Sequence, residues 1–335
     1  MPDLDDRLDA WDHQTRHDPE AIVRAAIQGA TMTRRPFAYA TSFLIEELAV
    51  TAPDGTHRSY LAKQLGRGAL SVQARRAKSG DLPCPGRELL VYRDLLAGLD
   101  LGTPGFVGGS FDDEDGVLVI ERVDGAPLTE IGDFTAWTAA AAWLARAHAR
   151  LGAAARGTDG RTPGWLLRYD EALLDERGRR GTFRAERLGL GSTGDRAALG
   201  FHLDRALESF RCAAPTVVHG DLYPSNVLIA GSRIAVVDWE LAGIGPALCD
   251  LAALSSGRWT AERRRALAMA YRDEAAHWGD VDDMDTFLAR LDLAALHVAL
   301  CWLGSSSEWE PPAEHRHDWF ATALSVVRRL EAVRT

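Results

Sequence analysis

The sequence has little of what a disulfide framework or a zinc site requires. Its 335 residues include four cysteines, Cys84, Cys212, Cys249 and Cys301, and none of them stands in a CxxC or CxxH spacing. Disulfide frameworks and structural zinc sites draw on closely spaced cysteines and histidines. We therefore expect a protein of a reducing compartment, with a cytoplasmic location.

The sequence also lacks a surplus of basic residues and a long apolar run. Its formal net charge of -10 argues against a nucleic-acid partner, because neutralising phosphates requires clustered Lys and Arg. The acidic N-terminus MPDLDDRLDAWDHQ does not resemble a signal peptide. The most apolar window, LDLAALHVALCWLG, is interrupted by Asp292 and His297, and its length is too short for a bilayer. We expect a soluble protein without a membrane partner; its oligomeric state is unknown from sequence.

The first third of the chain has the pattern of a β-rich domain. After a polar amphipathic helix around Asp5 to Gly29, the segments FAYATSFLIEELAV and RSYLAKQL flank the turn APDG, which predicts a hairpin. A helix is predicted over PGRELLVYRDLLAGL, with Pro85 near its start and Gly98 near its end. The apolar run GVLVIERV then predicts a buried strand.

From about Asp124 the pattern changes to long helices. Apolar residues at helical spacing predict helices over 133–152, 195–210, 248–255, 261–277, 283–303 and about 313–333. The expected fold class is therefore α+β, with two lobes. A small β-rich N-lobe covers 1–123, and a larger, mainly helical C-lobe covers 124–335.

The stretch VVHGDLYPSNVLI, residues 217–229, places Asp221 and Asn226 in a polar loop between apolar runs. A hairpin around Gly231 would bring Asp238, at the end of the next strand, close to Asn226. Oxygen ligands of this kind suit Mg²⁺, which takes one or two carboxylates together with substrate phosphates. The sequence therefore predicts a magnesium site with Asn226 and Asp238 as ligands.

The spacing of these residues matches the layout of a kinase catalytic loop. In that layout the first Asp, here Asp221, accepts the proton of the acceptor hydroxyl, while the Asn and the later Asp hold the metal. Two other interpretations exist. His219 is also explained as a buried core histidine, and a metallohydrolase could use His219 and Asp221 as ligands, although no HxH or HExxH supplies further ligands. The complete pattern favours phosphoryl transfer.

The block HGDLYPSNVLI…RIAVVDWELAGIGPALCDLAAL resembles the signature of the aminoglycoside phosphotransferase and choline kinase-like family. This resemblance implies a bilobal protein-kinase-like fold and a small-molecule kinase. It also implies that His219 supports the catalytic loop and that Asp250 does so by hydrogen bonding. The resemblance extends over nearly the whole chain, and the residues from His219 to Glu240 are its specific part.

The resemblance implies a strand lysine that contacts nucleotide phosphates and a helix glutamate that holds it. Lys63 in YLAKQL and Glu88 in GRELLVYRDLL match these positions. Taken alone, Lys63 is also explained as a solvent-facing strand residue. The role of Glu88 has an alternative as well, because Arg87, Arg93 and Asp94 show that this helix carries other charges without a catalytic role. A GxGxxG motif is missing, so Thr41, Ser42 and nearby N–H groups are the candidates for cradling phosphate.

Adenine recognition is expected along the connection VIERVDGAPL. Backbone groups from Glu121 to Val123 would pair with the base, and side chains such as Val119 and Leu228 would sandwich it. No APE motif and no long activation segment follow Asp238, which argues against a protein kinase. The acceptor is therefore expected to be a small molecule bound by the helical lobe.

The acceptor itself is less defined. An amine-bearing acceptor would need carboxylates of the C-terminal region, but acids there are also explained by helix N-termini. Tryptophans of the same region could form a wall that stacks on a sugar, but Trp on helices is more often part of the core. The candidates are Asp280, Asp282, Asp283, Asp285, Asp292, Glu308, Glu310 and Glu314 with Trp302, Trp309 and Trp319. The prediction is an ATP- or GTP-dependent, Mg²⁺-dependent transfer to a hydroxyl of an aminoglycoside or another antibiotic or metabolite. The alternative is a catalytically inactive nucleotide-binding module.

Overall fold

A computed structural model describes residues 17–38, 42–71, 74–75, 84, 86–156, 162–257, 259–305 and 317–332. The chain divides into two compact units. The first comprises Met1–Gly125 with Ala235–Leu241, and the second comprises Ala126–Ile234 with Ala242–Thr335. The domain boundary expected from the sequence, after residue 123, assigns residues 235–241 to the second domain. In the structure these residues cluster with the first unit.

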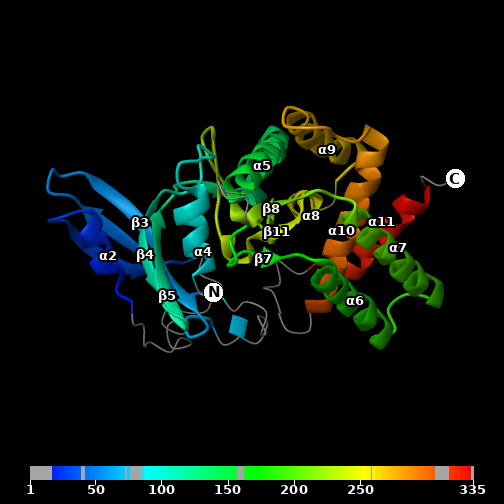
Figure 1. Cartoon of the computed structure of the whole chain (residues 1–335), viewed down its shortest axis with the longest axis horizontal. Helices are drawn as coiled ribbons and strands as arrows, with labels where there is room; N and C mark the ends of the chain where they lie inside the picture. Colours follow the sequence, from blue (N-terminus) through cyan, green and yellow to red (C-terminus); the bar gives the residue numbers. More distant parts are fainter. Residues whose placement is uncertain are drawn as a thin grey trace. The chain divides into compact units, whose positions relative to one another are not determined.

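The first unit is built on a five-stranded antiparallel sheet (Figure 1). Its spatial order is β1-β2-β3-β5-β4, with bounds β1 Thr31–Pro36, β2 Ile45–Thr51, β3 His57–Gly66, β4 Phe106–Phe111 and β5 Asp115–Glu121. The predicted hairpin is β2–β3, and the predicted buried strand is β5. The sequence did not indicate β1 because its residues are mostly exposed and polar, nor β4, which contains two glycines.

The two faces of this sheet have different roles. Ala62 lies opposite Val119, and both are buried with Val23 of helix α2 (Pro19–Ala26) in one core. Lys63 lies opposite Leu118 and therefore points to the other face. The expectation that Val119 contacts adenine is wrong, because its side chain is fully buried in the core against α2.

The other face of the sheet packs against helix α4 (Arg87–Leu90) (Figure 1). This helix continues as the π-helical segment η1 (Val91–Leu96), where the N–H of Ala97 donates to the carbonyl of Tyr92 at 3.1 Å. The predicted helix over 85–99 is therefore present but changes its winding after one turn. Such π-helical segments are frequent at functional sites.

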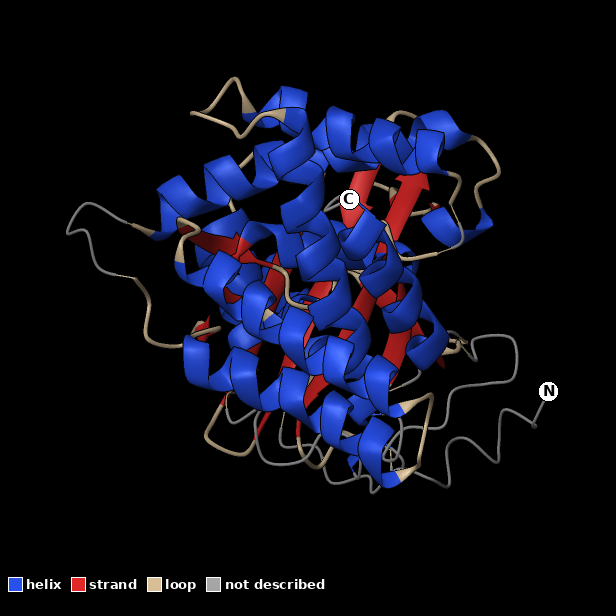
Figure 2. Ribbon diagram, turned by 90° about the vertical axis from the view of Figure 1, so that its right-hand side faces the viewer, coloured by secondary structure: helices blue, strands red, loops and turns tan. Residues whose placement is uncertain are grey.

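The second unit is mainly helical, and Figure 2 shows its helices packed side by side. The helices are α5 Phe134–Ala155, α6 Glu171–Arg187, α7 Thr193–Arg211, α8 Ala247–Leu254, α9 Ala261–Ala275, α10 Met284–Ser305 and α11 Trp319–Ala332. Helix α10 packs against α6, α7, α8, α9 and α11 and forms the centre of the unit. All but α6 follow the predicted ranges within a few residues.

Helix α10 has 22 residues and, by length and composition, could cross a membrane. The segment is therefore not too short for a bilayer, contrary to the expectation from its sequence. Burial gives a better reason against a membrane span, because 61% of its apolar window is buried inside the structure. Core helices of water-soluble proteins have this character.

Helix α6 was hidden in the sequence by two glycines, which are poor helix formers. Gly178 and Gly181 are buried where α6 meets its neighbours. A Cβ at Gly178 would lie 2.6 Å from Leu203 Cδ1, and one at Gly181 would overlap the carbonyl of Leu300 in α10. The glycines therefore allow α6 and α10 to approach closely.

Short strands position the polar loop of the second unit. Strands β7 (Leu167–Arg168), β11 (Gly243–Pro246) and β8 (Pro215–Val218) form one small sheet in that order. Strand β9 (Val227–Ala230) pairs with β6 (Ala126–Pro127) and is joined through Gly231 to β10 (Arg233–Val236), as the hairpin prediction requires. The loop 219–226 connects β8 to β9 and ends in the 3₁₀ turn η3 (Pro224–Asn226).

Candidate active site

In the first unit, Lys63 is buried between two carboxylates. Its Nζ lies 2.6 Å from Glu88 Oε2 and 2.5 Å from Asp238 Oδ1. The side chain of Lys63 is 9% exposed and that of Glu88 3%, whereas that of Asp238 is 36% exposed. Lys63 is therefore not a solvent-facing strand residue, and Asp238 is the open side of the cluster.

The ring of Phe43 completes the surroundings of Lys63, since the Nζ lies 4.7 Å from its centroid. Phe43 forms an isolated bridge with Leu70, and the carbonyl of Ser42 accepts the N–H of Ser71 at 2.9 Å. Thr41 lies outside the described residues. Phe43 was not indicated by the sequence, although it is the residue next to the phosphate candidate Ser42.

Asp238 has an unusual backbone. Its φ of 67° makes it the only non-glycine residue with positive φ among those the structure describes. This left-handed conformation costs free energy for a residue with a Cβ, and such strain is concentrated at functional sites. The next residue, Trp239, is 2% exposed, and its Nε1–H donates to the carbonyl of Val236 at 3.1 Å.

Arg87 ties the start of α4 to the segment after Asp238. Its guanidinium donates to the carbonyl of Glu240 at 3.0 Å, and the residue is only 4% exposed. The charges of Arg87 and Glu88 on this helix are therefore buried. Those of the neighbouring pair Arg93 and Asp94 are exposed, and the two residues bond to each other near the surface.

The charges around Lys63 do not balance. Burial raises the pKa of Glu88 to about 7, and the nearby Asp238 adds to this while Lys63 opposes it. Burial opposes the charge of Lys63, but Asp238, Glu88 and Glu240 together raise its pKa well above the ordinary value. One ammonium therefore faces three carboxyl groups, and the excess negative charge favours a further cation.

Tyr92 also belongs to this cluster and was missed in the sequence. It is 1% exposed, and burial followed by the charge of Glu88 raises its pKa well above the ordinary value. Within the described part of the chain, its buried hydroxyl has no hydrogen-bond partner. An unpaired buried hydroxyl costs free energy, so this atom needs an explanation.

The predicted adenine connection has a defined set of backbone bonds. The N–H of Glu121 donates to Gly105 at 2.8 Å, and its carboxylate accepts the N–H of Gly105 at 3.0 Å. The N–H of Arg122 donates to Ser59 at 3.0 Å. In the ranges that the structure covers, the N–H of Val123 has no acceptor. Leu228 lies on β9 opposite Pro127 and is half-buried.

In the second unit, Asp250 holds the polar loop. Its carboxylate accepts the N–H of His219 at 2.6 Å and that of Gly220 at 3.0 Å. His148 Nε2 lies 3.1 Å from the same carboxylate, and its Nδ1 lies 2.8 Å from the hydroxyl of Tyr271. His148 and Tyr271 were not indicated by the sequence, because only folding brings them to Asp250.

These contacts determine the charge of Asp250. Burial by itself would raise its pKa, but the hydrogen bond to His148 and the neighbourhood of His219 outweigh burial and lower the pKa. Asp250 is 2% exposed. It is therefore a buried, ionised acceptor at the root of the loop.

The loop is also braced from within. The N–H of Asp221 donates to His219 Nδ1 at 3.3 Å, and Asn226 Nδ2 donates to the carbonyl of Asp221 at 2.9 Å. Gly220 adopts φ of 81°, which only glycine reaches without strain. With its Nδ2 engaged, Asn226 retains its amide oxygen as the atom able to bind a metal.

A cavity of about 90 Å³ lies beside this loop and is lined entirely by residues of the second unit. Its polar and aromatic lining includes Tyr169, Arg177, Asp221, Tyr223, Cys301 and Trp302. The rings of Tyr223 and Trp302 meet edge to face at 5.3 Å, and Trp302 stacks on Trp319 at 5.7 Å. Trp309 lies outside the described residues.

The acids proposed for a cationic acceptor mostly have structural partners. Asp292 is buried between Arg264 at 2.6 Å and Arg329 at 2.8 Å. Asp282 pairs with Arg290, Asp283 accepts N–H groups at the start of α10, and Asp285 lies 3.8 Å from Arg265. Asp280 is exposed, and Glu308, Glu310 and Glu314 lie outside the described residues. None of the five acids that the structure describes, Asp280, Asp282, Asp283, Asp285 and Asp292, lines the cavity beside Asp221.

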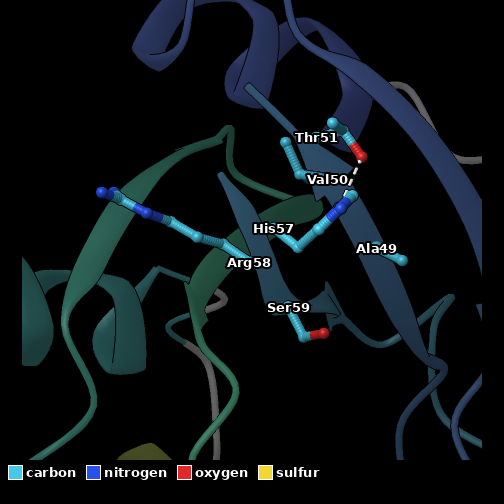
Figure 3. Close-up of a pocket in the computed structure, with 6 residues that line it drawn as sticks. All are labelled: Ala49, Val50, Thr51, His57, Arg58 and Ser59. Carbon is cyan, nitrogen blue, oxygen red and sulfur yellow. Dashed lines mark hydrogen bonds between the residues drawn. The ribbon is translucent and has the colours of Figure 1, made fainter. Parts of the chain in front are cut away.

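A second depression, of about 160 Å³, lies on strands β2 and β3 (Figure 3). Figure 3 shows His57 hydrogen-bonded to Thr51 there, at 2.9 Å. Its lining is Ala49, Val50, Thr51, His57, Arg58 and Ser59, without a carboxyl group. It offers neither a metal ligand set nor a paired acid and base, and we assign it no chemistry.

Comparison with known proteins identifies the family. The model of the phosphotransferase enzyme family (APH) matches residues 91–287, more than half of the chain. The chain belongs to this phosphotransferase family. Viomycin phosphotransferase of Streptomyces vinaceus is similar to it, with 35% identity over 218 residues that cover 61% of this chain and 72% of that protein. The resemblance found in the sequence is thereby confirmed, and this family member is a small-molecule kinase.

Solved structures of kinases share its fold. A choline kinase from Cryptosporidium parvum Iowa II has a TM-score of 0.57 at 13% identity, covering 95% of each chain. A GDP complex of an aminoglycoside 2'-phosphotransferase-IIIa mutant has a TM-score of 0.56 at 16% identity, covering 94% of this phosphotransferase and 97% of that chain. The predicted protein-kinase-like α+β fold is confirmed.

Proposed function

We propose that this phosphotransferase transfers the γ-phosphate of ATP or GTP, with Mg²⁺, to a hydroxyl group of a small molecule. The observation that carries this proposal is the buried cluster of Lys63, Glu88 and Asp238. A lysine between these carboxylates matches the lysine that contacts nucleotide phosphates in kinases and the glutamate that holds it. Domain roles follow, with nucleotide binding in 1–123 and acceptor binding in 124–335.

The proposed magnesium ligands are Asp238 and Asn226. No group of three or more His, Cys, Asp or Glu side chains in the described ranges is arranged to hold a metal by itself. Mg²⁺ fits this, because it takes one or two protein ligands and completes its shell with phosphates and water. The excess negative charge around Lys63 and the exposure of Asp238 agree with a cation at that carboxylate. When bound, the ion neutralises charge on the phosphoryl oxygens.

The proposed role of Asp221 is to accept the proton of the acceptor hydroxyl and to align that hydroxyl with the phosphate. Its carboxylate lines the cavity of the second unit, where a small acceptor has room. The bonds from Asn226 and to His219 hold the loop around it, and Asp250 anchors that loop from below. A preorganised base of this kind reduces the cost of orienting the reactants.

The base of the nucleotide would pair with backbone groups from Glu121 to Val123, and the N–H of Val123 is available for it. Leu228 remains a candidate for contact with the base, and Thr41 and Ser42 for contact with phosphate. GTP is proposed beside ATP as the phosphate donor, because the similar structure of an aminoglycoside phosphotransferase is that of its GDP complex.

The acceptor class proposed from the relatives is an antibiotic or a related hydroxylated metabolite, since one relative is a viomycin phosphotransferase and one structural neighbour an aminoglycoside phosphotransferase. The cytoplasmic location stays a prediction from the cysteine spacing. The inactive-module alternative has no structural observation in its favour, because Lys63, Glu88 and Asp238 form a complete cluster.

The nucleotide half of the proposal is tested by the binding of Mg-ATP and Mg-GTP to the nucleotide-free protein. Lys63→Met is expected to raise the Kd of the preferred nucleotide on the order of tenfold, as the loss of a charge-assisted bond implies. Arg58→Met, at an exposed position of the same strand, is the matched control and should leave the Kd unchanged. Equal affinities for wild type and Lys63→Met would remove Lys63 from the nucleotide site.

A further inference from the structure

The cavity beside Asp221 contains an arginine without a carboxylate partner. Arg177 of α6 is half-buried, and its guanidinium carbon lies 5.5 Å from the ring centroid of Tyr169. Within the chain segments that the structure describes, no carboxylate lies within ion-pair distance of it. Arg179, two residues later, bonds at 2.8 Å to both Asp175 and Asp204.

This difference is informative because a partly desolvated guanidinium normally has an anionic partner. Arginine presents a planar set of donors that matches a carboxylate in two parallel hydrogen bonds. An arginine that lines a cavity and lacks a protein carboxylate therefore has the chemistry of a ligand-binding group. Arg179 on the same helix differs from Arg177, because Asp175 and Asp204 neutralise its charge within the protein.

His297 also lines the cavity. His297 of α10 donates to the carbonyl of Leu174 at 2.8 Å, and its Nδ1 lies 3.6 Å from Cys301 Sγ. Burial opposes the charge of His297, but the neighbouring thiols Cys301 and Cys249 raise its pKa well above the ordinary value.

The pKa of the Cys301 thiol depends on the charged groups around it. Burial alone would raise the pKa of its thiol, but His297, Arg177 and Arg180 outweigh burial and lower the pKa. A thiol loses its proton more readily where the potential is positive. The guanidinium of Arg177 therefore makes its side of the cavity favourable for negative charge.

The cavity also has an acidic lining residue. Asp221 lines it, and the other carboxylate there, Asp250, is occupied by the N–H groups of the loop and by His148. The pKa of Tyr169 reflects groups of both signs: burial raises it, Arg177 lowers it, and Asp250 and Asp221 raise it.

The position of Tyr169 is fixed by the backbone of β11. A Cβ at Gly245 would lie 2.7 Å from the Cβ of Tyr169, and one at Gly243 would lie 2.7 Å from its Cε2. The ring can therefore pack directly on the strand, with Arg177 over its face. The cavity therefore has an aromatic wall with Arg177 over its face, and this wall is also influenced by Asp221.

We propose that Arg177 determines the acceptor class by binding a carboxylate of the acceptor while the acceptor hydroxyl faces Asp221. The role of Asp221 in this statement rests on the proposed function, whereas the binding of an anion by Arg177 does not. Hydroxy acids are then preferred over amino alcohols and polyamines, because an ammonium group would meet Arg177 with like charge. A neutral or amine-rich acceptor gains nothing from Arg177.

The first test uses alkylation of Cys301 in the nucleotide-free protein by iodoacetate, an anion, and by the neutral iodoacetamide. In both reactions the thiolate displaces iodide, forming a C–S bond as the C–I bond breaks. Peptide mass spectrometry gives the ratio of the two rates at Cys301 and at the exposed Cys212, which serves as the reference. We expect the iodoacetate preference at Cys301 to exceed that at Cys212 several-fold.

Substitutions identify the source of this preference. Arg177→Gln should reduce the ratio at Cys301 at least threefold, whereas Arg177→Lys should retain most of it. Arg179→Gln is the matched control on the same helix and should change neither thiol. Equal ratios in wild type and Arg177→Gln, or a loss of the ratio in Arg177→Lys as large as in Arg177→Gln, would overturn the proposal.

The second test measures protection of Cys301 from iodoacetamide by glycerate and by ethanolamine. Glycerate should slow alkylation of wild type at a concentration at least tenfold lower than ethanolamine, and Arg177→Glu should reverse this order. Stronger protection of wild type by ethanolamine would overturn the proposal. Neither test involves phosphoryl transfer. A protein that prefers anions here but transfers no phosphate would refute the proposed function alone, and the opposite result would refute this inference alone.

Discussion

The Nζ of Lys63 lies 2.5 Å from Oδ1 of Asp238, although 175 positions separate the two residues in the chain. The segment Ala235–Leu241 makes this contact possible, because it clusters with the β-rich unit and not with its chain neighbours. Asp238 keeps a strained backbone there, with φ of 67°. The buried Trp239 follows Asp238, and the short strand β10 precedes it, so both neighbours hold the backbone on either side of the contact.

The pKa of Glu88 predicts how stability depends on pH. Burial raises this pKa from 4.5 to about 7 in the folded state. Between these values the folded protein holds a proton that the unfolded chain has released, so the free energy of unfolding falls as pH rises. Wild type should lose on the order of 2 kcal/mol relative to Glu88→Gln between pH 5 and pH 8 in urea unfolding. Parallel pH profiles of the two proteins would show that Glu88 is ionised throughout.

The unpaired hydroxyl of Tyr92 predicts an unusual substitution. Tyr92→Phe removes a buried donor that has no partner in the described residues, so it should leave stability unchanged or raise it by about 1 kcal/mol. Tyr271→Phe is the matched control, because its hydroxyl contacts His148 at 2.8 Å, and it should cost about 1 kcal/mol. Urea unfolding measures both. A destabilisation of Tyr92→Phe larger than that of Tyr271→Phe would mean that the Tyr92 hydroxyl has a bound partner.

Asp250 predicts a coupled loss of stability and activity. In Asp250→Asn the amide offers one acceptor oxygen to a site where two N–H groups and His148 converge. We expect a loss of about 3 kcal/mol in unfolding free energy and a fall in kcat on the order of a hundredfold, because the loop carrying Asp221 loses its anchor.

The matched control for Asp250→Asn is Asp280→Asn, at an exposed position. It removes the same charge and should leave both quantities unchanged. Because the pKa of Asp250 is lowered by its partners, its contribution to stability is present above the ordinary carboxyl range and is lost as pH falls through the folded-state value. Wild-type kinetics in Asp250→Asn would separate this residue from the catalytic loop.

Much of the fold and of the proposed site could be predicted from local sequence patterns. The alternation of apolar residues in β2, β3 and β5 and the helical spacing of α5, α7 and α10 were visible because each element has one buried face. The loop with Asp221 and Asn226 was visible because its spacing matches the layout of a kinase catalytic loop. Helix α6 was not, because its two glycines serve packing at the cost of helix propensity.

The residues that were missed share a different property. Phe43, Tyr92, His148 and Tyr271 act through contacts with residues distant in sequence, and nothing in their local surroundings marks them. Val119 was placed wrongly because a shift of one position on a strand reverses the face of the sheet. The burial of Arg87 could not be predicted, since the sequence does not show which side of α4 is buried.

The central claim is that this phosphotransferase uses Asp221 to direct a nucleotide γ-phosphate to an acceptor hydroxyl. The most direct measurement is transfer of label from γ-³²P-ATP or γ-³²P-GTP to a panel of hydroxy acids, antibiotics and other hydroxylated metabolites that includes viomycin. Wild type should label at least one acceptor in a Mg²⁺-dependent manner, and Asp221→Asn should do so about a thousandfold more slowly, with nucleotide affinity within about twofold of wild type. Equal labelling rates for the two proteins, or no Mg²⁺-dependent labelling by wild type, would contradict the account.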